Sequence, residues 1–144
     1  MLNSITDGIS IKLDSVFGEG YEIYDENVKQ GLEEPCFFIK PLKVINKPLL
    51  GKRKQRTYPF DIAYFPKEGN AEMMEVSEKA LDGLEYITLT NGDVLRGTSL
   101  EAEIVDGVLH ISVNYIVFLN DTSTGESMEG VTTDIGVKGV GNGN

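Results

Sequence analysis

Two runs of aromatic and β-branched residues, separated by a polar stretch, dominate the hydrophobic pattern of the chain. The first covers residues 35–40 and the second covers residues 58–65. In the second run the apolar side chains occupy alternate positions, and so lie on one face of a β-strand. These residues are Tyr58, Phe60, Ile62 and Tyr64. The pattern predicts a long antiparallel hairpin with this face in the core. Because Pro41 and Pro48 cannot donate ladder hydrogen bonds, we expect the first strand to leave the sheet or become an edge beyond about Lys40.

Two other segments carry apolar residues at steps of three and four, the spacing of an amphipathic helix. The first covers residues 3–17 and is followed by a glycine, which commonly ends helices. The second covers residues 71–85 and follows Asn70, a favourable N-cap. Within it, Glu75 and Lys79 have the spacing of a helical ion pair. The expected apolar faces contain Leu2, Ile5, Ile9, Leu13 and Val16 in the first helix and Met73, Ser77, Ala80, Leu81 and Leu84 in the second.

The most regular alternation predicts a second hairpin over residues 100–119, with Asp106-Gly107 as a two-residue turn. A turn of this length places Val105 opposite Val108 and thereby sets the register of both strands. The expected apolar pairs on the core face are Ile104 with Leu109, Ala102 with Ile111, and Leu100 with Val113.

Shorter segments complete the predicted set of elements. Residues 21–24 and 86–89 alternate as short strands, and Asn91-Gly92 is expected to turn the second of them into a strand at Val94. The acidic stretch 25–34 predicts a loop or a further edge strand. In chain order the elements are a helix, strands, a helix and strands. The predicted fold class is therefore α+β, with a mixed or antiparallel sheet and two helices packed on one of its faces.

Length and composition agree with one domain. A chain of 144 residues with 40% hydrophobic and 25% charged residues is ordinary for a globular protein. Residues 120–144 are too rich in glycine and small polar residues to supply a core. We therefore expect an α+β domain at residues 1–119, a long protruding β-hairpin at residues 40–58, and a flexible, glycine-rich C-terminal tail. No apolar run approaches the ~20 residues of a membrane-spanning helix. The N-terminus has no signal-peptide pattern, so we expect synthesis to end in the cytoplasm.

Charge is unevenly distributed along the chain. The stretch from Pro35 to Phe60 contains seven basic residues and no acidic one, and since the net charge is −10, the remainder carries −17. The seven are Lys40, Lys43, Lys47, Lys52, Arg53, Lys54 and Arg56. An acidic chain with a pI of about 4.5 does not fit a general nucleic-acid binder, because phosphate contacts need a positive field. Identical copies docking basic hairpin to acidic flank can close into a ring. The alternative explanation is a solvated edge that resists aggregation.

No catalytic or ligand-binding motif occurs in the sequence. Cys36 stands beside proline and phenylalanine, which favours a buried, unreactive thiol over a nucleophile. His110 falls on the polar face of the last strand; spacing fixes no carboxylate partner for it, which favours a solvated or interface role over a catalytic base. The Met73-Met74 pair favours a core role. Scattered acids indicate a solvated face instead of a cation site; they are Asp14, Glu22, Glu101 and Glu103. We therefore expect no enzyme, catalytic residue, metal or cofactor.

Four blocks of sequence carry a resemblance to a known family. They are Met1-Leu2-Asn3 with Gly8-Ile9, residues 30–39, residues 58–66 and residues 103–110. These blocks resemble the tail terminator, or tail-completion, family of contractile phage tails. Similar proteins occur in defective prophages and phage-tail-like bacteriocins of Gram-positive bacteria. The resemblance covers about residues 1–119 and includes no catalytic motif.

The resemblance implies a small structural subunit without enzymatic activity. Such subunits form a hexameric ring on the last ring of tail tube and sheath, stop its polymerisation, and offer a surface to a head connector or collar. The implied location is the head-proximal end of the tail in a phage or a headless bacteriocin, assembled in the bacterial cytoplasm. The expected partners are other copies and the tube and sheath proteins, with no membrane, and with DNA contact only if the hairpin faces the lumen. The alternatives are another tail-completion or adaptor protein, or a nucleic-acid-binding module. The expected interface residues are Lys47, Lys52, Arg53, Lys54 and Arg56.

Overall fold

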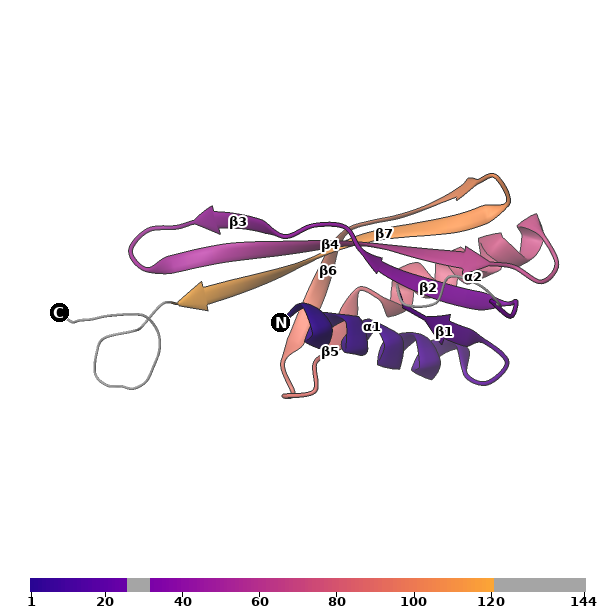
Figure 1. Ribbon diagram of the computed structural model, residues 1–144, viewed down its shortest axis with the longest axis horizontal. Coiled ribbons are helices and arrows are strands. Elements are labelled where there is room, and N and C mark those ends of the chain that lie inside the picture. Colours follow the sequence, from indigo (N-terminus) through magenta and orange to yellow (C-terminus); the bar gives the residue numbers. More distant parts are fainter. Residues whose placement is uncertain (26–31, 121–144) are drawn as a thin grey trace. The chain divides into compact units, whose positions relative to one another are not determined.

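The computed structural model describes residues 1–25 and 32–120, which contain two helices and a seven-stranded mixed sheet (Figure 1). The elements are α1 (Leu2–Phe17), β1 (Glu22–Tyr24), β2 (Cys36–Pro41), β3 (Ile45–Pro48), β4 (Arg53–Phe65), α2 (Asn70–Gly83), β5 (Tyr86–Thr88), β6 (Val94–Val105) and β7 (Val108–Asn120). The order in the sheet is β1-β2-β4-β7-β6-β5, and β3 pairs with β4 beside this path. Since β1 is parallel to β2 while β2 and β4 are antiparallel, the sheet is mixed and the predicted α+β class is confirmed.

The described residues fall into two compact units, one formed by residues 1–45 and 56–117, the other by residues 46–55 and 118–120. In the first unit α1 and α2 lie against the same face of the sheet (Figure 1), as predicted. The predicted tail, beyond Asn120, and most of the acidic stretch 25–34 lie outside the described residues. The division of the chain into a domain and a tail therefore stays a prediction. Neither α1 nor α2, the helices of the described residues, has the length and apolarity that crossing a membrane requires.

The periodic segments form the elements that they predict. On α1 the residues that pack into the core are Ile5, Gly8, Ile9 and Leu13, and the helix ends where Gly18 adopts a φ of 75°. All four alternating residues of β4 are buried. The pairing of Cys36 with Phe65 through Pro41 with Phe60 confirms the long hairpin. As expected from its prolines, the first strand ends at Pro41, and the chain then forms the separate strand β3.

The start of α2 differs from the prediction. Asn70 is not the N-cap: the helix begins at Asn70, Gly69 is the cap residue, and no side-chain cap bond forms there. Instead Glu72 accepts hydrogen bonds from the backbone N–H of Glu68 at 2.7 Å and of Lys67 at 3.2 Å, and from the Tyr64 hydroxyl. The Glu72 carboxylate, two residues into the helix, therefore accepts the N–H groups of the preceding turn and links this turn to Tyr64 on β4.

Two smaller expectations about α2 were also wrong. Glu75 and Lys79, both described, form no ion pair within 4 Å. Met74 is 56% exposed, whereas Met73 beside it is buried. Of the expected apolar face, Met73, Ser77, Ala80 and Leu84 are buried and Leu81 is only partly buried; Val76 is buried as well. A one-residue step on a helix turns the side chain by about 100°, which separates the two methionines.

The hydrogen bonds at Glu72 predict a pH dependence of stability. Burial would raise the pKa of Glu72, but the bonds from Tyr64, Glu68 and Lys67 outweigh it and lower that pKa. A pKa below its unfolded value of about 4.3 means that the stabilisation is present above that pH and is lost as the pH falls through the folded pKa. We expect Glu72→Gln to lower the free energy of unfolding by about 1 kcal/mol at pH 7, because the bonds lose their charge.

Urea unfolding at pH 7 and at pH 3 measures this effect. The difference between wild type and Glu72→Gln should shrink from pH 7 to pH 3, because the wild-type carboxylate takes up a proton as the pH falls through its lowered pKa. Glu75→Gln is the control, since Glu75 is exposed on the same helix, and it should stay within about 0.5 kcal/mol of wild type at both pH values. A Glu72→Gln deficit that is equal at the two pH values would contradict the assignment.

The last hairpin follows its predicted register as far as Glu101. Val105 pairs with Val108, Ile104 with Leu109 and Ala102 with Ile111, as expected. The expected pair of Leu100 and Val113 does not form, because the register shifts between Thr98 and Glu101. Ser99, which has a φ of 54°, and Leu100 together occupy the place opposite Val113, as in a β-bulge. The shift places Gly97 opposite Tyr115.

Candidate assembly interface

The five cations predicted as interface residues lie along β3, β4 and the turn that joins them. Lys47 is on β3, Lys52 is in the turn, and Arg53, Lys54 and Arg56 are on β4. Lys47, Lys52 and Arg53 are exposed, and Lys54 and Arg56 are partly exposed. The charges that form one run in the sequence therefore also lie together in one short hairpin of the fold.

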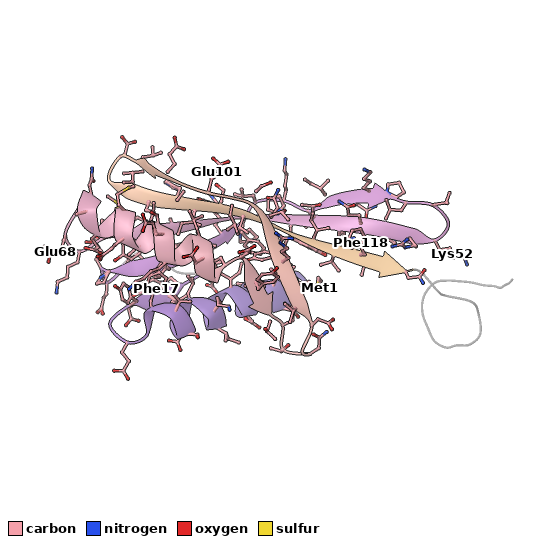
Figure 2. All side chains as sticks on the ribbon, turned by 180° about the vertical axis from the view of Figure 1, so that it is seen from behind. Met1, Phe17, Lys52, Glu68, Glu101 and Phe118 are labelled. Carbon is pink, nitrogen blue, oxygen red and sulfur yellow. The ribbon has the colours of Figure 1, made fainter. Side chains whose placement is uncertain are left out.

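The turn between β3 and β4, residues 49–52, carries the most exposed large apolar side chain of the described residues. The Leu49 N–H donates to the Arg53 carbonyl at 2.9 Å, and Gly51 takes a left-handed φ of 72° that suits glycine. Leu50 is 94% exposed, and Lys52 marks the same turn in Figure 2. A leucine this exposed gains nothing from the fold of its own chain. Nothing in the sequence predicts this exposure, because the pattern of apolar residues does not say which of them stay uncovered.

Four of the five cations take part in no ion pair within the described residues. In the part of the chain that the structure describes, ion pairs join Arg96 to Glu85 at 3.5 Å and His110 to Asp61 at 3.1 Å. Neither pair involves Lys47, Lys52, Arg53 or Lys54. These four side chains are therefore available to an external acidic surface.

His110 lies on the sheet face opposite the buried side chains of β7. Its Nδ1 is 3.1 and 3.2 Å from the two carboxylate oxygens of Asp61 on the neighbouring strand β4. Glu103 stands across from it on β6. The sequence could not show the Asp61 contact, because only strand pairing brings residues 49 positions apart together. The partly exposed pair fits the solvated or interface role expected for this histidine.

Cys36 is fully buried, as expected. Burial raises the pKa of its thiol, and the nearby carboxylates Glu34 and Glu22 raise it further. A raised pKa keeps the thiol protonated, and a protonated thiol is a poor nucleophile. Among residues 1–25 and 32–120, no three His, Cys, Asp or Glu side chains are grouped so that they could hold a metal ion. The described site therefore offers charged and apolar surface for contact with another molecule.

A family model described as phage tail terminator protein matches residues 4–127. The chain belongs to the phage tail terminator family. Its role is therefore structural and lies in tail completion, as a virion component that interacts with other parts of the phage tail. The family is not generally enzymatic, and the family match agrees with the resemblance carried by the four sequence blocks.

Comparison with other proteins adds little to the family match. No curated protein sequence matches this tail terminator chain. One solved structure aligns with 10% identity and a TM-score of 0.43, covering 82% of this chain and 94% of that chain. At that level of similarity nothing about function transfers from it.

The function of a tail terminator is better explained by the exposed basic hairpin of β3 and β4 than by buried groups of the protein such as Cys36. The matched region includes all five predicted interface cations and the turn with Leu50. A structural subunit works through its contacts, and this hairpin combines exposed charge with exposed apolar area, the two components of a protein interface.

Proposed function

We propose that this chain forms a hexameric ring that caps the head-proximal end of a contractile tail tube and sheath and stops their polymerisation. The observation that carries the proposal is the family match over residues 4–127. A closed ring of identical copies needs two different, complementary surfaces on each copy. The segregation of seven cations into one stretch of a chain with net charge −10 supplies such a pair.

The proposed contact residues are Lys47, Lys52, Arg53, Lys54 and Arg56. They would face acidic side chains of an adjacent copy or of the tube below, within a particle assembled in the bacterial cytoplasm. Part of this attraction is between exposed charges, so it should weaken as salt rises and the Debye length falls from about 10 Å at 0.1 M to about 3 Å at 1 M. Neither a cofactor nor a membrane takes part in the proposed assembly.

Native mass spectrometry and electron microscopy of the purified protein, alone and with growing tail tubes, test this proposal. We expect six-membered rings that cap tube ends, and tubes that stop growing once the protein is added. A chain that stays monomeric and leaves tube growth unchanged would count decisively against it. Capping by rings of another size would correct the stoichiometry and leave the capping role in place.

The exposed cations also favour a second candidate, contact with DNA in the lumen of the tail. In that case binding to duplex DNA should fall steeply with salt, with a slope set by the number of phosphates contacted. Neutralising Lys52, Arg53 and Lys54 should remove about three phosphate contacts and so make the fall of affinity with salt less steep. Another tail-completion or adaptor role is distinguished by binding to a head connector or collar without capping of tubes.

A further inference from the structure

The outer face of α2 has the opposite character to the turn between β3 and β4. Met74 is 56% exposed there, and Glu75, Glu78 and Asp82 are exposed around it. Residues 74, 78 and 82 follow one another at steps of four, so they form one line along the helix. The helix contains four acidic residues and one lysine, and of the four acids Glu72 alone accepts hydrogen bonds from the described residues of its own chain. The result is an acidic strip with an apolar residue at one end.

The turn presents the complement of that strip. Leu50 is nearly fully exposed, and Lys52, Arg53 and Lys54 follow it. Lys52 ends the turn, and Arg53 and Lys54 begin β4 with their side chains on opposite faces of the strand, so the three cations cover roughly 7 Å of chain. At 1.5 Å per residue, the acids from Glu75 to Asp82 cover roughly 10 Å along the helix. The two charged segments are therefore of similar length, and each has an apolar side chain at its N-terminal end.

We infer that the turn of one copy together with the start of β4, residues 49–54, docks on the outer face of α2 of the next copy. Leu50 packs against Met74, and the cations face Glu75, Glu78 and Asp82. This inference rests on the proposed ring and adds the acceptor surface and the apolar anchor of its contact. A second copy is the occupant because the two surfaces are complementary in charge, belong to the same chain and differ from each other, as a closed ring requires.

The outer face of α1 is the competing acceptor on the same chain. It exposes Ile11 at 58%, between Asp7 and Asp14. It carries only these two acids, whereas the outer face of α2 carries Glu75, Glu78 and Asp82. The more acidic face of α2 is therefore the better complement to three cations. Ile11 provides a control position whose exposure nearly equals that of Met74.

Disulfide trapping distinguishes the two acceptors. The variant Leu50→Cys/Met74→Cys and the control Leu50→Cys/Ile11→Cys are oxidised under conditions in which the wild type assembles, alone or on tail tubes. Cys36 is fully buried and does not compete. We expect covalent multimers up to the closed ring, on a non-reducing gel, for the pair with Met74 and monomer for the pair with Ile11. Trapping through Ile11 instead, or through neither position while rings still form, overturns the α2 contact and leaves the ring proposal intact.

Charge reversal provides a second, independent test. Reversing the turn (K52E, R53E and K54E) or the helix (E75K, E78K and D82K) should each abolish assembly, and combining both sets in one chain should restore it. Circular dichroism of each variant establishes that loss of assembly is not loss of folding. Failure of the combined variant to assemble, although it is folded, overturns the inference. So does wild-type binding to anionic vesicles that depends on Leu50 without any trapping at Met74. A wild type that never assembles, with or without tubes, removes the proposed function and this contact together.

Discussion

Replacement of Phe37 by alanine is expected to lower the free energy of unfolding by about 4 kcal/mol. Phe37 is fully buried, and its ring centroid lies 4.9 Å from that of Phe17 on α1 and 4.8 Å from that of Tyr64 on β4. Tyr21 lies 6.0 Å away in the same cluster. The substitution therefore removes transfer free energy, leaves a cavity and breaks two close aromatic contacts at once. Phe37, on β2, therefore links α1 to β4.

Phe118→Ala is the matched control for this prediction. Phe118 lies on β7 and is 60% exposed, so the same substitution there should change stability by less than about 0.5 kcal/mol. Urea unfolding at pH 7, followed by far-ultraviolet circular dichroism, measures both variants. Equal losses for the two variants, or a loss below about 1 kcal/mol for Phe37→Ala, would show that the aromatic cluster does not hold α1 against the sheet.

The periodic parts of the fold could be predicted because their cause is local. Alternation along residues 58–65 decides which side chains face the core whatever lies across from them. The two-residue turn at Asp106-Gly107 likewise sets the pairing of the strands next to it. Both expectations depend only on residues near in sequence, and both were confirmed.

The parts that could not be predicted depend on contacts between distant residues. Asn70 is a good N-cap by type, but Tyr64 on β4 and the backbone before the helix give Glu72 three hydrogen bonds that no local pattern shows. Burial raises the pKa of the Tyr64 hydroxyl, and its bond to Glu72 raises it further, so this donor stays protonated. The contact of Asp61 with His110 was invisible for the same reason.

The charge of the candidate interface could be predicted from the sequence, but the exposure of its apolar side chains could not. A run of cations without acids identifies a basic hairpin from composition alone. The exposure of Leu50 and of Met74 became visible only with the fold, because the sequence does not say which apolar residues remain uncovered. The role of the five cations in assembly stays a prediction, and the tests above decide it.

The second stability prediction concerns Gly97, two residues before the β-bulge at Ser99. Gly97→Ala is expected to lower the free energy of unfolding by about 3 kcal/mol. A Cβ at this position would lie 2.7 Å from the Leu84 carbonyl oxygen and 2.8 Å from Val113 Cγ2. The Leu84 carbonyl cannot move aside easily, since it accepts a 2.7 Å hydrogen bond from the buried Tyr115 hydroxyl. Because the bulge shifts the register, glycine instead of Thr98 stands opposite Tyr115 at this close approach.

Gly83→Ala separates this steric argument from a general intolerance of alanine for glycine. Its added Cβ would also come within 2.8 Å of another atom, but that atom is Val16 Cγ2 of a partly exposed side chain, and not a backbone carbonyl held by a buried hydrogen bond. Alanine also favours the helix over glycine by about 1 kcal/mol, which offsets the adjustment. We expect Gly83→Ala to unfold within about 1 kcal/mol of wild type in the same urea titration. If Gly97→Ala lowers the free energy of unfolding as little as Gly83→Ala does, the Leu84 carbonyl can move away from β6 and the contact is not fixed. A large loss for Gly97→Ala alone supports a fixed contact between Leu84 and Gly97, which the register shift creates.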